Sequence, residues 1–127
     1  MNHPPFDPTP HATTAHSLQV FKAEIFKALS HPTRIRVLEM LREREMSVSE
    51  LSQALDLDIS NVSQHLTVLR NKGILEGRKS GLTVYYQVTH QGLYEVLDLF
   101  RAWFGEYVES RRKMFEVLEN SDSNRRA

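Results

Sequence analysis

Apolar residues recur at helical spacing along the first third of the chain, between stretches of turn-forming residues. Leu18, Phe21, Ile25 and Leu29 follow this spacing and predict a helix over about residues 18–29. The residues just before Pro32 interrupt the pattern, and proline is favoured at the first position of a helix. We therefore predict a second helix that begins at Pro32.

The next segment predicts two short helices joined by a tight turn. Ser47 and Glu50 match a capping box, which places a helix start near residues 47–49, after a short strand at 46–48. Asp58 is a suitable N-cap for the following helix, and Gly73 is suited to the left-handed position that ends it. The apolar face of that helix is formed by Val62, Leu66 and Leu69.

Two β-prone segments and a long helix complete the pattern. Residues 74–78 and 83–88 predict a hairpin, with residues 79–82 as its loop. A helical stripe then runs from about Gln91 to Glu119, a length of about 42 Å. The fold is thus expected to be mainly α with a small β-hairpin, in the order α-α-α-α-β-β-α. Two helices, a tight turn and a hairpin are typical of a winged helix-turn-helix.

The two ends of the sequence differ from this ordered centre. Residues 1–16 contain four of the five prolines and few apolar residues, so we expect a disordered N-terminal tail. Residues 121–127 are polar and are expected to form a disordered C-terminal tail. The folded domain is therefore predicted to span residues 17–120.

Composition narrows the class of protein. Hydrophobic residues make up 40% of the chain, yet no apolar run is long enough for a membrane span and no signal-peptide core is present. The sequence has no cysteine, which excludes disulfides and thiolate metal sites and fits a cytoplasmic location. No nucleophile–base pair or phosphate-binding glycine loop is visible, so we expect no enzymatic activity.

The net charge is zero, whereas a DNA-binding domain usually has a basic excess. The distribution of charge along the chain is more informative than the net charge. Residues 59–82 carry four Lys or Arg and one Glu, a local charge of +3, while residues 90–119 carry six acids and four bases, a local charge of −2. The basic excess lies in the predicted helix-turn-helix and wing.

The helix after Asp58 carries small and amide side chains opposite its apolar face. Asn and Gln can form paired hydrogen bonds to adenine, and Ser and Thr can reach bases or phosphates. Cations on the hairpin suit phosphates. The predicted DNA-binding residues are Ser60, Asn61, Ser63, Gln64, His65, Thr67, Arg70, Arg78 and Lys79. The alternatives are an ordinary solvated helix face, a hairpin charged for solubility and a structural role for His65.

Several segments resemble the ArsR family of bacterial winged-helix repressors. They are FKALSHPTRIRVL at 26–38, SEL at 49–51, NVSQHLTVLRNKGIL at 61–75 and GRKSGLTVYY at 77–86. The resemblance covers about residues 18–100. It implies a homodimer joined through the first and last helices, two recognition helices that read an inverted repeat in double-stranded DNA, and repression that an inducer relieves.

A partner for the last helix is also expected from its pattern, because its apolar stripe is longer than so small a domain can cover. The alternative is that this helix folds back on its own domain. The predicted dimer interface comprises Leu18, Phe21, Ile25, Phe100, Trp103, Phe104, Tyr107 and Phe115.

The sequence departs from the metal-sensing members of the family. The segment at 50–55 contains no thiol, and Asp98 and Glu106 lack nearby imidazoles in the last helix. We therefore expect none of the family's usual metal sites and no cofactor. One alternative is a Ni²⁺- or Cu²⁺-responsive repressor that uses the N-terminal His3, His11 and His16. Another is a winged helix that binds proteins instead of DNA.

Overall fold

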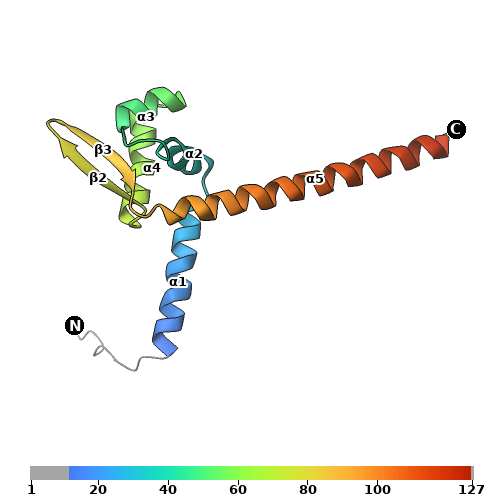
Figure 1. Ribbon diagram of the computed structural model, residues 1–127, viewed down its shortest axis with the longest axis horizontal. Coiled ribbons are helices and arrows are strands. Elements are labelled where there is room, and N and C mark those ends of the chain that lie inside the picture. Colours follow the sequence, from blue (N-terminus) through green and yellow to red (C-terminus); the bar gives the residue numbers. More distant parts are fainter. Residues whose placement is uncertain (1–11, 127) are drawn as a thin grey trace. The chain divides into compact units, whose positions relative to one another are not determined.

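The computed structural model describes residues 12–126, which form two compact units that divide after Thr89 (Figure 1). The second unit is one helix, α5 (Gly92–Arg126). The predicted order of helices and strands is confirmed, since the described chain is mainly helical with a small antiparallel sheet. The first unit contains α1 (Ala12–Leu29), α2 (Pro32–Met40), β1 (Met46–Ser47), α3 (Val48–Leu55), α4 (Ile59–Asn71), β2 (Leu75–Ser80) and β3 (Thr83–Val88).

Helix α4 lies at the centre of the first unit and contacts α2, α3 and β2. Its residues Val62, Leu66 and Leu69 are buried, as the helical spacing predicts. They belong to a core whose other fully buried side chains are Val37, Leu38, Leu51 and Leu75. The buried residues lie on one side of α4, and the opposite side of the helix is exposed along its whole length.

The predicted helix starts are largely confirmed. Ser47 and Glu50 form the capping box of α3, in which each side chain accepts a hydrogen bond from the other residue's backbone N–H at 3.2 Å. Pro32 occupies the start of α2, where His31 is the N-cap. Asp58 is the N-cap residue of α4, but its side chain makes no capping hydrogen bond among the described residues.

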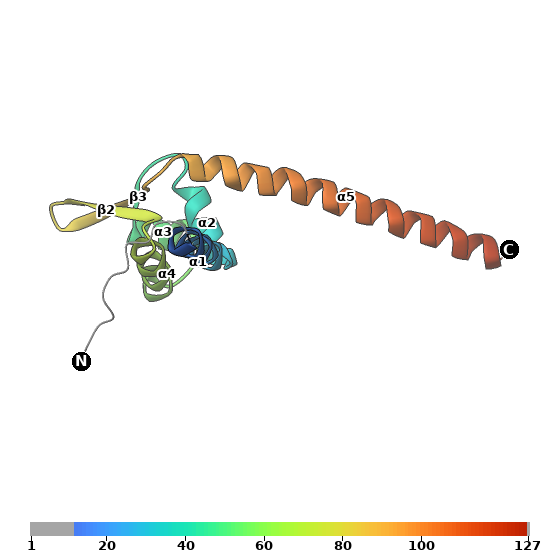
Figure 2. The ribbon, with the colours of Figure 1, turned by 90° about the horizontal axis from the view of Figure 1, so that it is seen from below.

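The sheet has the strand order β1-β3-β2, and both pairings are antiparallel. The predicted hairpin loop at 79–82 is too long, because Lys79 pairs with Val84 and Ser80 with Thr83. Only Gly81 and Leu82 form the turn, and Gly81 has a φ of 62°, which favours glycine. The hairpin projects away from the helices of its unit (Figure 2).

Two helices extend into the segments predicted as tails. Helix α1 begins at Ala12 instead of near Leu18, and α5 continues to Arg126 instead of ending near Glu119. Neither added segment contains Pro or Gly, the two residues that most disfavour a helix, so each can continue the helix that it adjoins. Residues 1–11 and 127 lie outside the described part. In the described range, no helix is long and apolar enough to cross a membrane.

Candidate nucleic-acid interface

The exposed side of α4 carries the polar set that the sequence predicts. All of these side chains are exposed, and they face away from the buried apolar residues of the same helix: Ser60, Asn61, Ser63, Gln64 and Thr67. The Thr67 hydroxyl donates to the Ser63 carbonyl at 2.9 Å, which fixes its rotamer and leaves the hydroxyl oxygen as an acceptor. Arg70 is exposed one turn further along. The structure thus brings hydrogen-bonding groups together on one rigid surface.

The turn between α3 and α4 sets the direction of this surface. Asp56 adopts a left-handed backbone conformation with a φ of 53°, which ends α3. The backbone N–H of Leu57 donates to the Ser52 carbonyl at 3.1 Å, and the Ser52 hydroxyl donates to the Leu57 carbonyl. These two hydrogen bonds hold the short connection, so α4 is positioned by the turn as well as by the core.

His65 lies at the edge of the exposed face and is partly buried. Its ring packs against the ring of His31, with centroids 4.3 Å apart. Burial lowers the pKa of His65 below its usual 6.5, and the charges of His31 and Arg34 lower it further. This environment favours the structural alternative for His65 over a phosphate contact. Sequence reasoning did not find its partner, although the position of His31 before Pro32 marks a helix cap.

The two cations of the hairpin have different surroundings. The Arg78 guanidinium donates to both carboxylate oxygens of Glu45, with Nε 3.1 Å from Oε2, and lies over the Tyr85 ring. This hydrogen bond holds the pKa of Glu45 below its usual value of 4.5. Lys79 is exposed and forms no ion pair with another residue of the described range. Of the two cations, Lys79 is therefore the one whose charge is not held by a neighbouring carboxylate. Glu45 was not predicted from the sequence, because its contact with Arg78 joins residues 33 positions apart.

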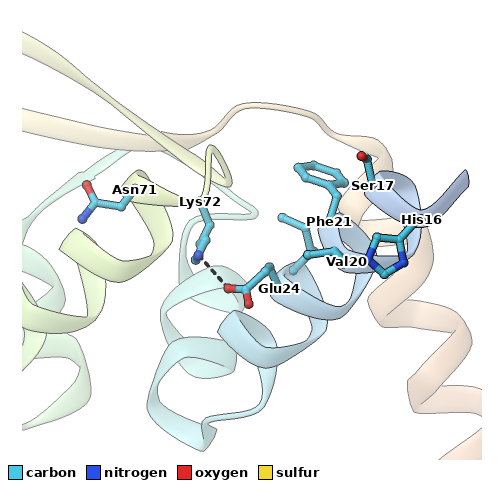
Figure 3. A pocket seen from close by; sticks show the side chains of 8 residues that line it. His16, Ser17, Val20, Phe21, Glu24, Asn71 and Lys72 are labelled. Carbon is cyan, nitrogen blue, oxygen red and sulfur yellow. Dashed lines mark hydrogen bonds and ion pairs between the residues drawn. The ribbon is translucent and has the colours of Figure 1, made fainter. Parts of the chain in front are cut away.

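Two of the three predicted interface residues of α1, Phe21 and Ile25, line a surface groove. Leu18 and Phe21 are 52% and 59% exposed, while Ile25 is partly buried. The groove has a volume of about 600 Å³ and lies between α1 and the end of α4 (Figure 3). Glu24 and Lys72 form an ion pair of 2.7 Å between these two helices. The lining residues are His16, Ser17, Val20, Phe21, Glu24, Ile25, Asn71 and Lys72.

The predicted interface residues of α5 are all at least 44% exposed: Phe100, Trp103, Phe104, Tyr107 and Phe115. Phe100 and Trp103 contact each other with ring centroids 6.2 Å apart. On the polar side, Arg112 forms ion pairs with Glu109 and Glu116, which support the helix through neighbouring turns. Such a run of exposed aromatic residues is typical of an interaction surface.

Of the three histidines in the metal alternative, one lies within the described residues. Residues 12–126 contain no group of three or more His, Asp or Glu side chains arranged to hold a metal ion. His16 is exposed at the groove of α1. His3 and His11 lie outside the described residues.

Comparisons with known proteins agree with this architecture. The family described as "Bacterial regulatory protein, arsR family" matches residues 31–76. An HTH-type transcriptional regulator of Mycobacterium tuberculosis, Rv0081, is 39% identical over 107 residues, which cover 84% of this chain and 94% of the relative. Its crystal structure has a TM-score of 0.68 and 40% identity, and the match covers 74% of this chain and 95% of that one.

Two further similarities are informative. The transcriptional activator HlyU of Vibrio cholerae is 37% identical over 75 residues, or 59% of this chain and 69% of the relative. The solution structure of a homodimeric winged helix-turn-helix DNA-binding domain from Mycobacterium bovis has a TM-score of 0.72. It covers 80% of this chain and 94% of that one, and its identity of 23% supports the fold alone. The chain belongs to the ArsR family of bacterial regulatory proteins and is a DNA-binding transcriptional regulator.

Proposed function

We propose that the protein is a repressor that binds an inverted repeat as a homodimer, with α4 of each copy in the major groove. The observation that carries this proposal is the exposed polar face of α4, which a buried apolar face and the α3–α4 turn hold in place. Side chains near the N-terminus of a recognition helix are the ones that reach base edges. Gln64 and Asn61 supply amides for adenine, and Ser60, Ser63 and Thr67 supply hydroxyls.

The phosphate contacts come from exposed cations around this face. Arg70 on α4 and Lys79 on β2 are both exposed, and such cations bind the DNA backbone without reading its sequence. Arg78 plays a different part in this proposal. Its bond to Glu45 and its position over Tyr85 brace the hairpin, so that Lys79 is presented from a stiff strand.

A second copy of the chain is the proposed cover for the apolar faces of α1 and α5. In α5, the positions Leu93, Leu97, Phe100, Phe104, Tyr107, Arg111, Met114 and Leu118 follow alternating spacings of four and three residues. This is the heptad pattern of helices that pair along their length, with Arg111 as its one charged position. The M. bovis domain of the same fold is a homodimer, which supports a dimer here. Two copies would also match the twofold symmetry of an inverted repeat.

Selection of bound DNA from a random pool, followed by footprinting on the selected site, tests the proposal. We expect an inverted repeat whose half-sites lie about one helical turn apart. Gln64→Ala is expected to weaken binding to this site by about 1–3 kcal/mol and to leave non-specific binding unchanged. Gln91→Ala, at an exposed position outside the helix-turn-helix, is the matched control. Recovery of no common sequence from the pool would refute the proposal.

Repression is tested separately from binding, because the similar protein HlyU is an activator. A reporter gene placed behind the selected site is expected to lose expression when the protein is present. The Gln64→Ala variant should restore that expression. Higher expression with the wild-type protein would exclude repression and leave the DNA-binding part of the proposal standing.

A further inference from the structure

A second, smaller cavity lies between α1, α2 and α4 of the first unit. Its volume is about 250 Å³. It is lined by Glu24, Lys27 and Ala28 of α1, Arg34 of α2, Val68 of α4, and Lys72, the C-cap residue of α4. Ala28 is almost completely buried, so the cavity reaches into the edge of the core. None of the side chains proposed to read DNA bases lines it.

The lining of this cavity has an excess of positive charge. Three of the six residues are cations and one is an acid, a balance of +2. Glu24 pairs with Lys72 at 2.7 Å, and this hydrogen bond holds the pKa of Glu24 below its usual 4.5. Lys27 lowers that pKa further through its charge. A single carboxylate therefore faces three cations, and Lys27 and Arg34 are not neutralised by it.

Arg34 adds a more specific feature. Its Nε atom is buried and has no hydrogen-bond partner within residues 12–126. A buried donor without a partner is costly, and such atoms are rare in folded proteins. The guanidinium is a planar fork that matches the two oxygens of a carboxylate or a phosphate. Arg34 thus supplies a directed donor where Lys27 and Lys72 supply charge.

We propose that this cavity binds a small oxyanion through a carboxylate or phosphate group. Arg34 provides the directed hydrogen bonds, and Lys27 and Lys72 provide the attraction. The oxyanion can come from a free small molecule or from the backbone of bound DNA. Because the lining joins α1 to the recognition helix α4, a free anion would act on both the proposed dimer helix and the DNA-reading helix. That consequence rests on the proposed function, whereas anion binding itself does not.

The test uses the full-length protein without DNA. Inorganic phosphate and succinate are titrated separately at constant ionic strength and followed by calorimetry. We expect saturable binding of one anion per chain for at least one of them, weakened at least tenfold in Arg34→Gln. Lys27→Gln should also weaken it, while Lys22→Gln, an exposed lysine of α1 outside the cavity, should bind like the wild type.

Arg34→Lys separates the donor geometry from the charge, and it is expected to bind more weakly than the wild type although the charge is kept. If Arg34→Gln does not fold, as judged by circular dichroism, Lys27→Gln and Arg34→Lys still decide the question. Wild-type affinity in both of these variants would mean an adventitious ion only and would overturn the site.

A second measurement assigns the source of the oxyanion. The dependence of DNA affinity on salt is measured for the wild type and for Lys27→Gln without added phosphate or succinate. A salt slope reduced by about 1, without saturable binding of free anions, assigns the site to a DNA phosphate. Saturable binding with an unchanged slope assigns it to a small molecule. If neither saturable binding nor a reduced slope is observed, the proposal is overturned. Loss of all DNA binding in the wild type would refute the proposed function and leave anion binding untouched.

Discussion

The ring of His31 packs against the ring of His65, with centroids 4.3 Å apart and planes tilted by 46°. His31 caps α2, because its Nδ1 accepts the backbone N–H of Thr33 at 3.1 Å. His65 belongs to α4 and lies next to Gln64, which we propose reads a base. The pair therefore joins the start of one helix to the recognition helix, and Arg34 adds a positive charge beside it.

This contact predicts a dependence of stability on pH. The pKa of His65 is lowered in the folded state, so the unfolded chain takes up a proton more readily as the pH falls through 6.5. The free energy of unfolding should be highest above this pH and should decrease below it. Urea unfolding between pH 5.5 and 7.5 measures this change, above the range in which carboxylates titrate.

His65→Gln should reduce the slope of stability against pH in this window. His16→Gln, at an exposed position of α1, is the control and should keep the slope of the wild type. Equal slopes in all three proteins would show that the ring contact does not perturb His65.

Local chemistry explains which features could be predicted from the sequence. The capping box of Ser47 and Glu50 depends on residues three positions apart, and Gly73 has the expected positive φ of 73°. The contacts of His65 with His31 and of Arg78 with Glu45 join residues more than thirty positions apart, and only the packed fold brings them together. The helix ends were missed because polar side chains mark solvent exposure and do not mark where a helix stops.

Removal of the α3 cap should destabilise the protein. Ser47→Ala loses the side-chain oxygen that accepts the Glu50 N–H, and caps of this kind contribute about 1 kcal/mol. We expect the free energy of unfolding to fall by about that amount in denaturant titrations at fixed protein concentration. Ser49→Ala, at an exposed position inside the same helix, should change it much less. Equal losses in the two variants would assign the effect to the helix interior and not to the cap.

The hairpin cations should differ in the salt dependence of DNA binding. Lys79→Ala is expected to reduce the slope of log affinity against log salt by about 1, the effect of one lost phosphate contact. Arg78→Ala should change the slope less, because Glu45 already holds its guanidinium. Glu45→Gln weakens that hold and should make the slope steeper. A larger effect of Arg78→Ala than of Lys79→Ala would reverse the roles that we give to the two cations.

The exposed apolar face of α5 should decide the oligomeric state. Phe104 is 65% exposed and lies in the middle of the heptad positions, and truncation of a central aromatic hot spot costs an interface about 2 kcal/mol or more. Phe104→Ala is therefore expected to raise the Kd of the dimer at least about 30-fold in sedimentation equilibrium. Arg101→Ala lies outside the heptad positions of the same helix and should leave the Kd close to that of the wild type. Specific DNA binding should weaken with the dimer, since each copy then contacts one half-site alone. If Phe104→Ala leaves the Kd of the dimer unchanged, Phe104 is not part of the interface. If the wild-type protein is a monomer at micromolar concentration, the proposed homodimer is refuted.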